Sequence, residues 1–136
     1  MTDHTTTTTT SFAPMLYIKH AEGEAAIAFY TKAFAAKEIR RFSNDDGTVH
    51  VAELEIAGNI FHLHEEVARE NELSPSTLSG TCVVIGLFTE HVDELFHNAV
   101  EAGATIKSAP KDYEYGMRQA YVNDPFGHHW QIQKYI

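Results

Sequence analysis

Carboxylate, imidazole and amide side chains recur at every second position in two segments of this 136-residue chain. In the first segment, a two-residue turn at Ala57-Gly58 would place Glu53 opposite His62 on paired strands and bring His64 onto the same face. The residues on the other face of both strands are apolar, so that face must cover a core. We therefore expect Glu53, His62 and His64 to lie together on the open face of a sheet.

Two interpretations of this group differ in what Glu53 and His62 do. A carboxylate beside an imidazole can act as a general base, or the pair can hold one metal ion together with Gln131. The alternative is a polar pair that only forms a hydrogen bond on a partly solvated sheet face. The residue types alone leave both interpretations open.

The second segment, residues 128–134, alternates in the same way. Its polar side chains His129 and Gln131 share one face, whereas Trp130 and Ile132 share the other. We expect Arg118, from the preceding strand, to join His129 and Gln131, where a guanidinium would bind a carboxylate or phosphate group. The alternative for Arg118 is a surface ion pair with an acidic residue.

The elements that position these residues occur twice along the chain. The spacing of the copies is regular, because 66 residues separate Phe29 from Leu95 and 69 separate Gly58 from Gly127. Such a recurrence indicates a duplicated module. Strand, helix and three strands are predicted in that order at residues 15–18, 22–36, 37–42, 48–56 and 59–65, and again at 81–88, 90–102, 105–108, 117–123 and 128–134.

Apolar residues follow a helical spacing in both predicted helices, so each helix packs one stripe on a sheet and leaves the other sheet face free. The predicted fold class is α+β, with two βαβββ modules that form a curved mixed sheet around a cavity. The polar tract of residues 1–13 is expected to be a disordered tail. One domain follows at residues 14–136, made of module one at 14–66, a linker at 67–80 and module two at 81–136.

Composition restricts the partners and the compartment. Nineteen acidic residues against ten basic ones give a formal net charge of -9, which disfavours nucleic acid and anionic membranes and favours a small-molecule ligand. The single cysteine, Cys82, cannot form an intrachain disulfide, and its apolar neighbours predict a buried thiol. No apolar run approaches the roughly 20 residues of a membrane span and no signal peptide is recognisable, so we expect a cytoplasmic protein.

Four segments, taken in order, carry a resemblance to a known family: Ala25-Ala26-Ile27-Ala28-Phe29-Tyr30, His50-Val51-Ala52-Glu53-Leu54, Tyr115-Gly116-Met117-Arg118 and Asp124-Pro125-Phe126-Gly127-His128-His129-Trp130. At these residues the chain resembles the vicinal-oxygen-chelate superfamily (glyoxalase/bleomycin resistance/extradiol dioxygenase) and, within it, the PhnB-like branch. The match covers nearly the whole chain after the tail. One departure is Ala35-Ala36 after the first helix, where the family usually has glycine.

The resemblance implies a metal site and an oligomer. The superfamily uses four metal-ligand positions, which fall here near Met15, His62, Val84 and Gln131. Of these, only His62 and Gln131 have side chains that coordinate well, so the implied divalent metal would bind through these two residues. Family members commonly pair, and the resemblance therefore implies a homodimer.

Three functions are compatible with these expectations. The first, which we favour, is a glyoxalase-like or dioxygenase-like enzyme of unassigned reaction, a metal-assisted lyase or isomerase in which Glu53 or His62 moves a proton. The second is a non-catalytic protein that sequesters a small molecule or antibiotic, as bleomycin-resistance proteins do. The third is an interaction or regulatory domain with a vestigial cavity.

Overall fold

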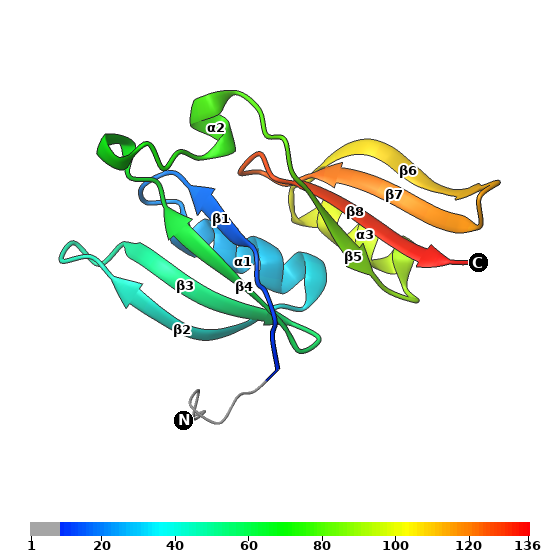
Figure 1. Cartoon of the computed structure of the whole chain (residues 1–136), viewed down its shortest axis with the longest axis horizontal. Coiled ribbons are helices and arrows are strands. Elements are labelled where there is room, and N and C mark those ends of the chain that lie inside the picture. Colours follow the sequence, from blue (N-terminus) through cyan, green and yellow to red (C-terminus); the bar gives the residue numbers. More distant parts are fainter. Residues whose placement is uncertain (1–8) are drawn as a thin grey trace.

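A computed structural model describes residues 9–136, which form two four-stranded sheets with their helices (Figure 1). Module one contains β1 (Met15–Ile18), α1 (Gly23–Phe34), β2 (Lys37–Ser43), β3 (Val49–Ile56) and β4 (Asn59–Glu65). Module two contains β5 (Val84–Phe88), α3 (Val92–Ala102), β6 (Thr105–Tyr113), β7 (Met117–Asn123) and β8 (His129–Tyr135). Two short helices, η2 (Ala68–Glu70) and α2 (Pro75–Leu78), lie between the modules. The predicted repetition of strand, helix and three strands is confirmed.

The two sheets share one topology. Their strand orders are β1-β4-β3-β2 and β5-β8-β7-β6, and the first pair in each is parallel while the others are antiparallel. The β3–β4 hairpin turns through Ala57 and Gly58, whose φ angles of 48° and 86° suit a two-residue connection. Glu53 therefore pairs with His62, in the register that the turn predicts.

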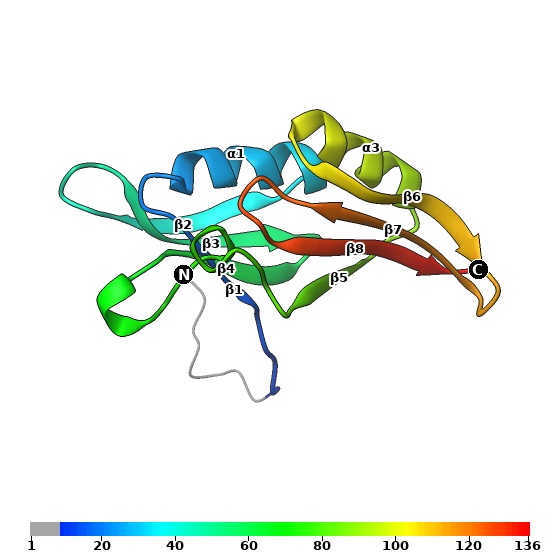
Figure 2. The same cartoon turned by 90° about the horizontal axis from the view of Figure 1, so that it is seen from above.

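Helices α1 and α3 lie on the same side of the two sheets and pack against each other (Figure 2). Aromatic side chains from both modules meet beneath them. Tyr30 and Phe34 of α1 contact Trp130 of β8, with ring centroids 5.6 and 4.8 Å apart, respectively. All three side chains are buried, so one core stabilises both modules by removing apolar surface from water.

This packing corrects one expectation. The sheets lie side by side, each with its open face turned away from the helices, and they do not close around a shared cavity within the chain (Figure 2). The contact between α1 and α3 holds the sheets beside each other. A closed cavity would instead require the two open faces to turn toward each other.

Asp124, in the turn between β7 and β8, fastens the modules together through a buried carboxylate that accepts four hydrogen bonds. The backbone N–H groups of Phe126 and His128 donate to Oδ1 at 2.9 and 3.0 Å. Nε1 of Trp130 donates to Oδ2 at 2.9 Å, and the hydroxyl of Tyr30 donates to the same oxygen. Burial and the charge of Asp124 raise the pKa of Tyr30 well above its ordinary value, so the phenol stays a donor.

Two expectations about module two were wrong. Strand β6 continues to Tyr113 instead of ending at Ser108, because an edge strand tolerates Pro110. Cys82 is exposed, since β5 begins only at Val84 and leaves the cysteine outside the strand.

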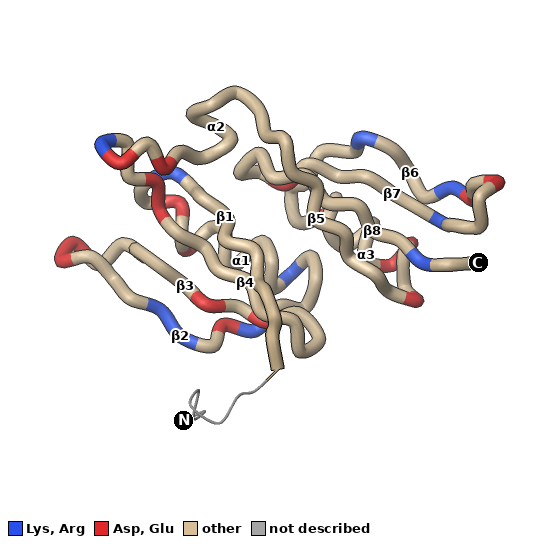
Figure 3. Tube along the Cα trace, in the orientation of Figure 1, with Lys and Arg blue, Asp and Glu red and all other residues tan. Residues whose placement is uncertain are grey.

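The basic residues are spread over both modules (Figure 3). The guanidinium groups of Arg40, Arg41 and Arg118 have carboxylate partners, so these charges are compensated within the module that carries them. None of the helices in residues 9–136 has the length and hydropathy needed to cross a lipid bilayer.

Candidate functional site

The open face of module one carries a carboxylate–imidazole pair. Nε2 of His62 on β4 lies 3.0 Å from Oε2 of Glu53 on β3. The side chains of His62 and Glu53 are 28% and 19% exposed, respectively, so solvent or a ligand can reach both. Because an ionised carboxylate only accepts, the imidazole donates through Nε2–H and, in its neutral form, keeps a lone pair on Nδ1.

Arg40 on β2 lies next to Glu53 of this pair, and the sequence pattern did not predict its place there. Its Nε lies 3.7 Å from Oε1 of Glu53. The β2–β3 ladder is irregular on both sides of this position, between Glu38 and Arg40 and between Phe42 and Ser43, so counting from the turn does not give its register. The two oxygens of Glu53 thus face different partners.

His64 provides a second imidazole on the same face. Its Nδ1 lies 2.7 Å from the backbone oxygen of Glu65, which can only accept, so Nε2 of the neutral ring holds the lone pair. The ring packs edge-on against Tyr17 of β1, with centroids 5.6 Å apart. Tyr17 escaped prediction because the parallel pairing of β1 with β4 cannot be counted from a hairpin turn.

The open face of module two carries amides and one imidazole. His129 and Gln131 of β8 lie on this face. Beside them, Nε2 of Gln119 donates to Oε1 of Gln133 at 2.8 Å, and both side chains are buried. The hydroxyl of Tyr115 donates to Gln119. Alternation along β7 would have found Gln119 once the register of the β7–β8 hairpin was known.

Arg118 does not lie on this open face, contrary to expectation. It pairs with Lys134 of β8 on the side of the sheet that α3 covers. There its guanidinium binds Asp93 through two contacts of 2.9 Å and Asp112 through a third of 2.9 Å. The backbone closes the β7–β8 turn over residues 125–127, and this register places the even-numbered residues of β7 beneath the helix.

His62 and Gln131 belong to different sheets and do not meet in a common hollow of the described chain. Two hollows on the surface formed by residues 9–136 lie elsewhere, and neither is lined by His62 or Gln131. One, of about 240 Å³, lies at the start of α3. The other, of about 330 Å³, lies between the modules.

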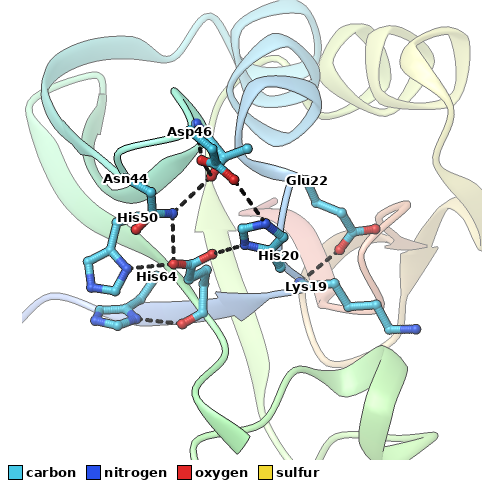
Figure 4. A network of polar contacts seen from close by, with 9 residues as sticks. Lys19, His20, Glu22, Asn44, Asp46, His50 and His64 are labelled. Atoms are coloured by element: carbon cyan, nitrogen blue, oxygen red, sulfur yellow. Dashed lines mark hydrogen bonds and ion pairs between the residues drawn. The ribbon is translucent and has the colours of Figure 1, made fainter.

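A second polar cluster includes His20, Asn44 and His50 (Figure 4), which all contact the carboxylate of Glu65 at the end of β4. Nδ1 of His20 lies 2.6 Å from Oε2, Nδ1 of His50 lies 2.7 Å from Oε1, and Nδ2 of Asn44 donates to Oε1 at 2.9 Å. Burial alone would raise the pKa of Glu65, but these hydrogen bonds outweigh it and lower the pKa to about 2. The cluster ties the β1–α1 loop and the β2–β3 turn to the end of β4.

The side chains that the structure describes do not complete a metal site. Within residues 9–136, no three His, Cys, Asp or Glu side chains are grouped so that they could hold a metal ion. Met15, which lies beside His62 in the sheet, and Val84 on β5 are not ligands for a hard or borderline divalent cation. His62 and Gln131 remain, on separate sheets, and two ligands are fewer than a catalytic site requires.

The fold is of the α+β class and is built from two βαβββ modules. The helices cover one side of the sheets, and polar side chains lie on each open face. The family model of the Glyoxalase/Bleomycin resistance protein/Dioxygenase superfamily matches residues 16–132. The chain belongs to this superfamily.

Relatives extend over most of the chain. It is 38% identical over 125 residues to the uncharacterized protein Mb0911c of Mycobacterium bovis, covering 90% of this chain and 81% of the relative. A gene product of Arabidopsis thaliana superposes with a TM-score of 0.71 at 29% identity, covering 91% of this chain and 98% of that one. The fosfomycin resistance protein FosX of Listeria monocytogenes, solved with Mn(II) and sulfate, has the same fold, with a TM-score of 0.68 at 20% identity over 96% of this chain and 93% of that one.

Proposed function

We propose that this protein is an enzyme of the lyase or isomerase type that binds a small molecule on the open face of module one and moves a proton with Glu53 and His62. The observation that carries the proposal is the 3.0 Å contact between Nε2 of His62 and Oε2 of Glu53 on a partly exposed sheet face. Membership in a superfamily that includes glyoxalases and dioxygenases supports the reaction class.

In this proposal Nδ1 of His62 is the general base. Glu53 accepts the Nε2–H hydrogen bond, which fixes the tautomer, and it offers a negative charge to the imidazolium that forms when Nδ1 takes a proton. Arg40 lies against the other oxygen of Glu53 and restrains the carboxylate. His64 lies on the same face, where its Nε2 can accept a hydrogen bond from a substrate hydroxyl. No step is assigned to a metal, because the donor set does not complete a site.

The test follows the exchange of a carbon-bound proton with solvent deuterium. The protein is incubated in D₂O with dihydroxyacetone or with the hemithioacetal of methylglyoxal and glutathione, and mass spectrometry measures deuterium next to the carbonyl. We expect exchange with at least one probe and a rate about 10²- to 10⁴-fold lower in His62→Ala. Glu53→Gln should lower the rate by about 10- to 100-fold.

His97→Ala is the matched control, because this imidazole lies on α3 with its side chain 71% exposed. Its rate should equal that of the wild type. An unchanged rate in His62→Ala, or no exchange with either probe, contradicts the proposal.

We also infer a homodimer in which a second copy covers the open face of module two. Large apolar side chains are exposed on the open face of module two, including Val84 at 44%, Phe88 at 56% and Tyr135 at 74%. The rings of Phe88 and Tyr135 are stacked with centroids 5.5 Å apart. Clustered exposed apolar surface of this kind is typical of protein interfaces.

Phe88→Glu is expected to convert the dimer to a monomer, because a carboxylate would be buried without a partner at the interface. Sedimentation equilibrium measures the mass of each variant. Ile106→Glu is the matched control, since Ile106 is 53% exposed on β6 and pairs with Val122 on the helix side of the sheet. A monomeric wild type, or a Phe88→Glu variant that still dimerises, contradicts the inference.

A further inference from the structure

A groove of about 330 Å³ lies between the two modules, separate from the Glu53 and His62 pair. One wall comes from β1 and the other from residues 80–85, which lead into β5, and α2 lies over one end of the space between these strands (Figure 1). The volume falls in the range of small-molecule pockets, about 300 to 1,000 Å³. The groove is therefore of a size for one small ligand.

The lining of the groove is neutral and mostly apolar. It contains no Asp, Glu, Lys or Arg side chain, although the chain as a whole has a net charge of -9. Its apolar side chains include Met15, Leu73, Leu78, Val83 and Ile85. A charged ligand would lose its hydration without gaining a partner here, so the lining favours an uncharged molecule.

His128 is the one imidazole that lines the groove, and its side chain is held in place. It is 8% exposed, and its Nε2 lies 2.8 Å from the backbone oxygen of Tyr17 on β1. Because that oxygen only accepts, Nε2 carries the proton of the neutral ring and Nδ1 is left as an acceptor. No side chain or backbone group among residues 9–136 donates to this Nδ1.

The wall next to His128 is also held in place. A Cβ atom built on Gly127 would lie 2.8 Å from Cβ of Pro75, so the turn before β8 packs directly against the start of α2. This close approach requires glycine, which also has a φ of 91° here. The groove is thus fixed by both modules and by the linker between them.

We propose that this groove binds an uncharged, mostly apolar small molecule with one O–H or N–H donor. The apolar body would pack between the two walls of the groove, and the donor would bind Nδ1 of His128. This site goes beyond the proton-transfer site of module one, because none of Glu53, His62 and His64 lines it.

The test compares 2-naphthol with 2-methoxynaphthalene, which has the same ring system but no donor. Titrations of the full chain are followed by the methyl NMR signals of Ile85 in the groove. In the wild type, 2-naphthol should bind about tenfold more tightly than the ether, as expected for one hydrogen bond. In His128→Phe this preference should disappear while the ether still binds.

Two further variants test the groove without touching His128. Leu78 is 59% exposed at its edge, and Leu78→Glu should weaken both probes about tenfold or more by placing a charge against the aromatic body. Ile106→Glu, on a distant strand, should leave both affinities unchanged.

Three results overturn the proposal: no shift of the Ile85 signals with 2-naphthol, equal affinities for the two probes in the wild type, or wild-type binding in Leu78→Glu. His62→Ala should bind both probes as the wild type does. Failure of the groove and failure of the proton-transfer site are therefore distinguishable.

Discussion

Asp124→Ala is expected to lower the free energy of unfolding by about 3 to 5 kcal/mol, since it removes a buried charge that several donors need. The hydroxyl of Tyr30 and Nε1 of Trp130 would remain buried without an acceptor, as would the backbone N–H groups of Phe126 and His128. Urea unfolding followed by tryptophan fluorescence measures the loss, because the indole of Trp130, the single tryptophan, donates to Asp124 itself.

Tyr30→Phe is the graded comparison for this prediction. It removes one of the four donors and keeps the ring, so it should cost about 1.5 to 3 kcal/mol, the range for a hydrogen bond to a charged group. Equal losses in Tyr30→Phe and Asp124→Ala, or no loss in either, would show that the carboxylate does not fasten the modules.

Glu65→Gln is the second substitution with a large expected effect, about 2 to 3 kcal/mol of unfolding free energy at pH 7. The wild-type carboxylate is 11% exposed, and its pKa falls from 4.5 to about 2 on folding. A lowered pKa means that the stabilisation is present above pH 4.5 and is lost as the pH falls toward 2. The difference between variant and wild type should therefore shrink steadily below pH 4.5.

The imidazole of His20 makes the free energy of unfolding depend on pH in the opposite direction at higher pH. Its hydrogen bond to Glu65 raises the pKa of His20 above 6.5, so its contribution is complete below pH 6.5 and is lost as the pH rises through the raised value. The cluster should stabilise the fold most between about pH 4.5 and 6.5. Urea unfolding midpoints at pH 3, 5.5 and 8 for wild type and Glu65→Gln measure the loss of stability at low pH and the loss at high pH.

Glu101→Gln is the control for the pH series. The side chain of Glu101 is 60% exposed and pairs with His97 on the helix surface. Such exposed pairs contribute little, so its midpoints should follow those of the wild type. A Glu65→Gln difference that stays constant from pH 8 to pH 3 would rule out the lowered pKa as its cause.

The sequence was sufficient for features that depend on one hairpin. Ala57 and Gly58 form a two-residue turn, and the register of β3 and β4 follows by counting, so the pairing of Glu53 with His62 was predictable. The repetition of the module was predictable from the regular spacing of its turns and helix stripes.

Features that depend on bulges, turn length or packing between modules were not predictable in this way. Arg40 lies next to a bulge, and Arg118 depends on a turn whose length the residue types do not fix. The side-by-side arrangement of the sheets follows from contacts between α1 and α3, which are far apart in the sequence. Local patterns therefore predicted which residues share a face within each module. The arrangement of the two sheets relative to each other depends on packing between distant segments, which local patterns do not reveal.

The two open faces share a backbone plan but differ in chemistry. Module one presents the carboxylate of Glu53 with the imidazoles of His62 and His64, whereas module two presents the amides of Gln119 and Gln131 with the imidazole of His129. A molecule that touched both faces would meet a carboxylate on one module and amides on the other. The proposed ligand would therefore bind in one orientation, whereas two identical faces would accept it in either.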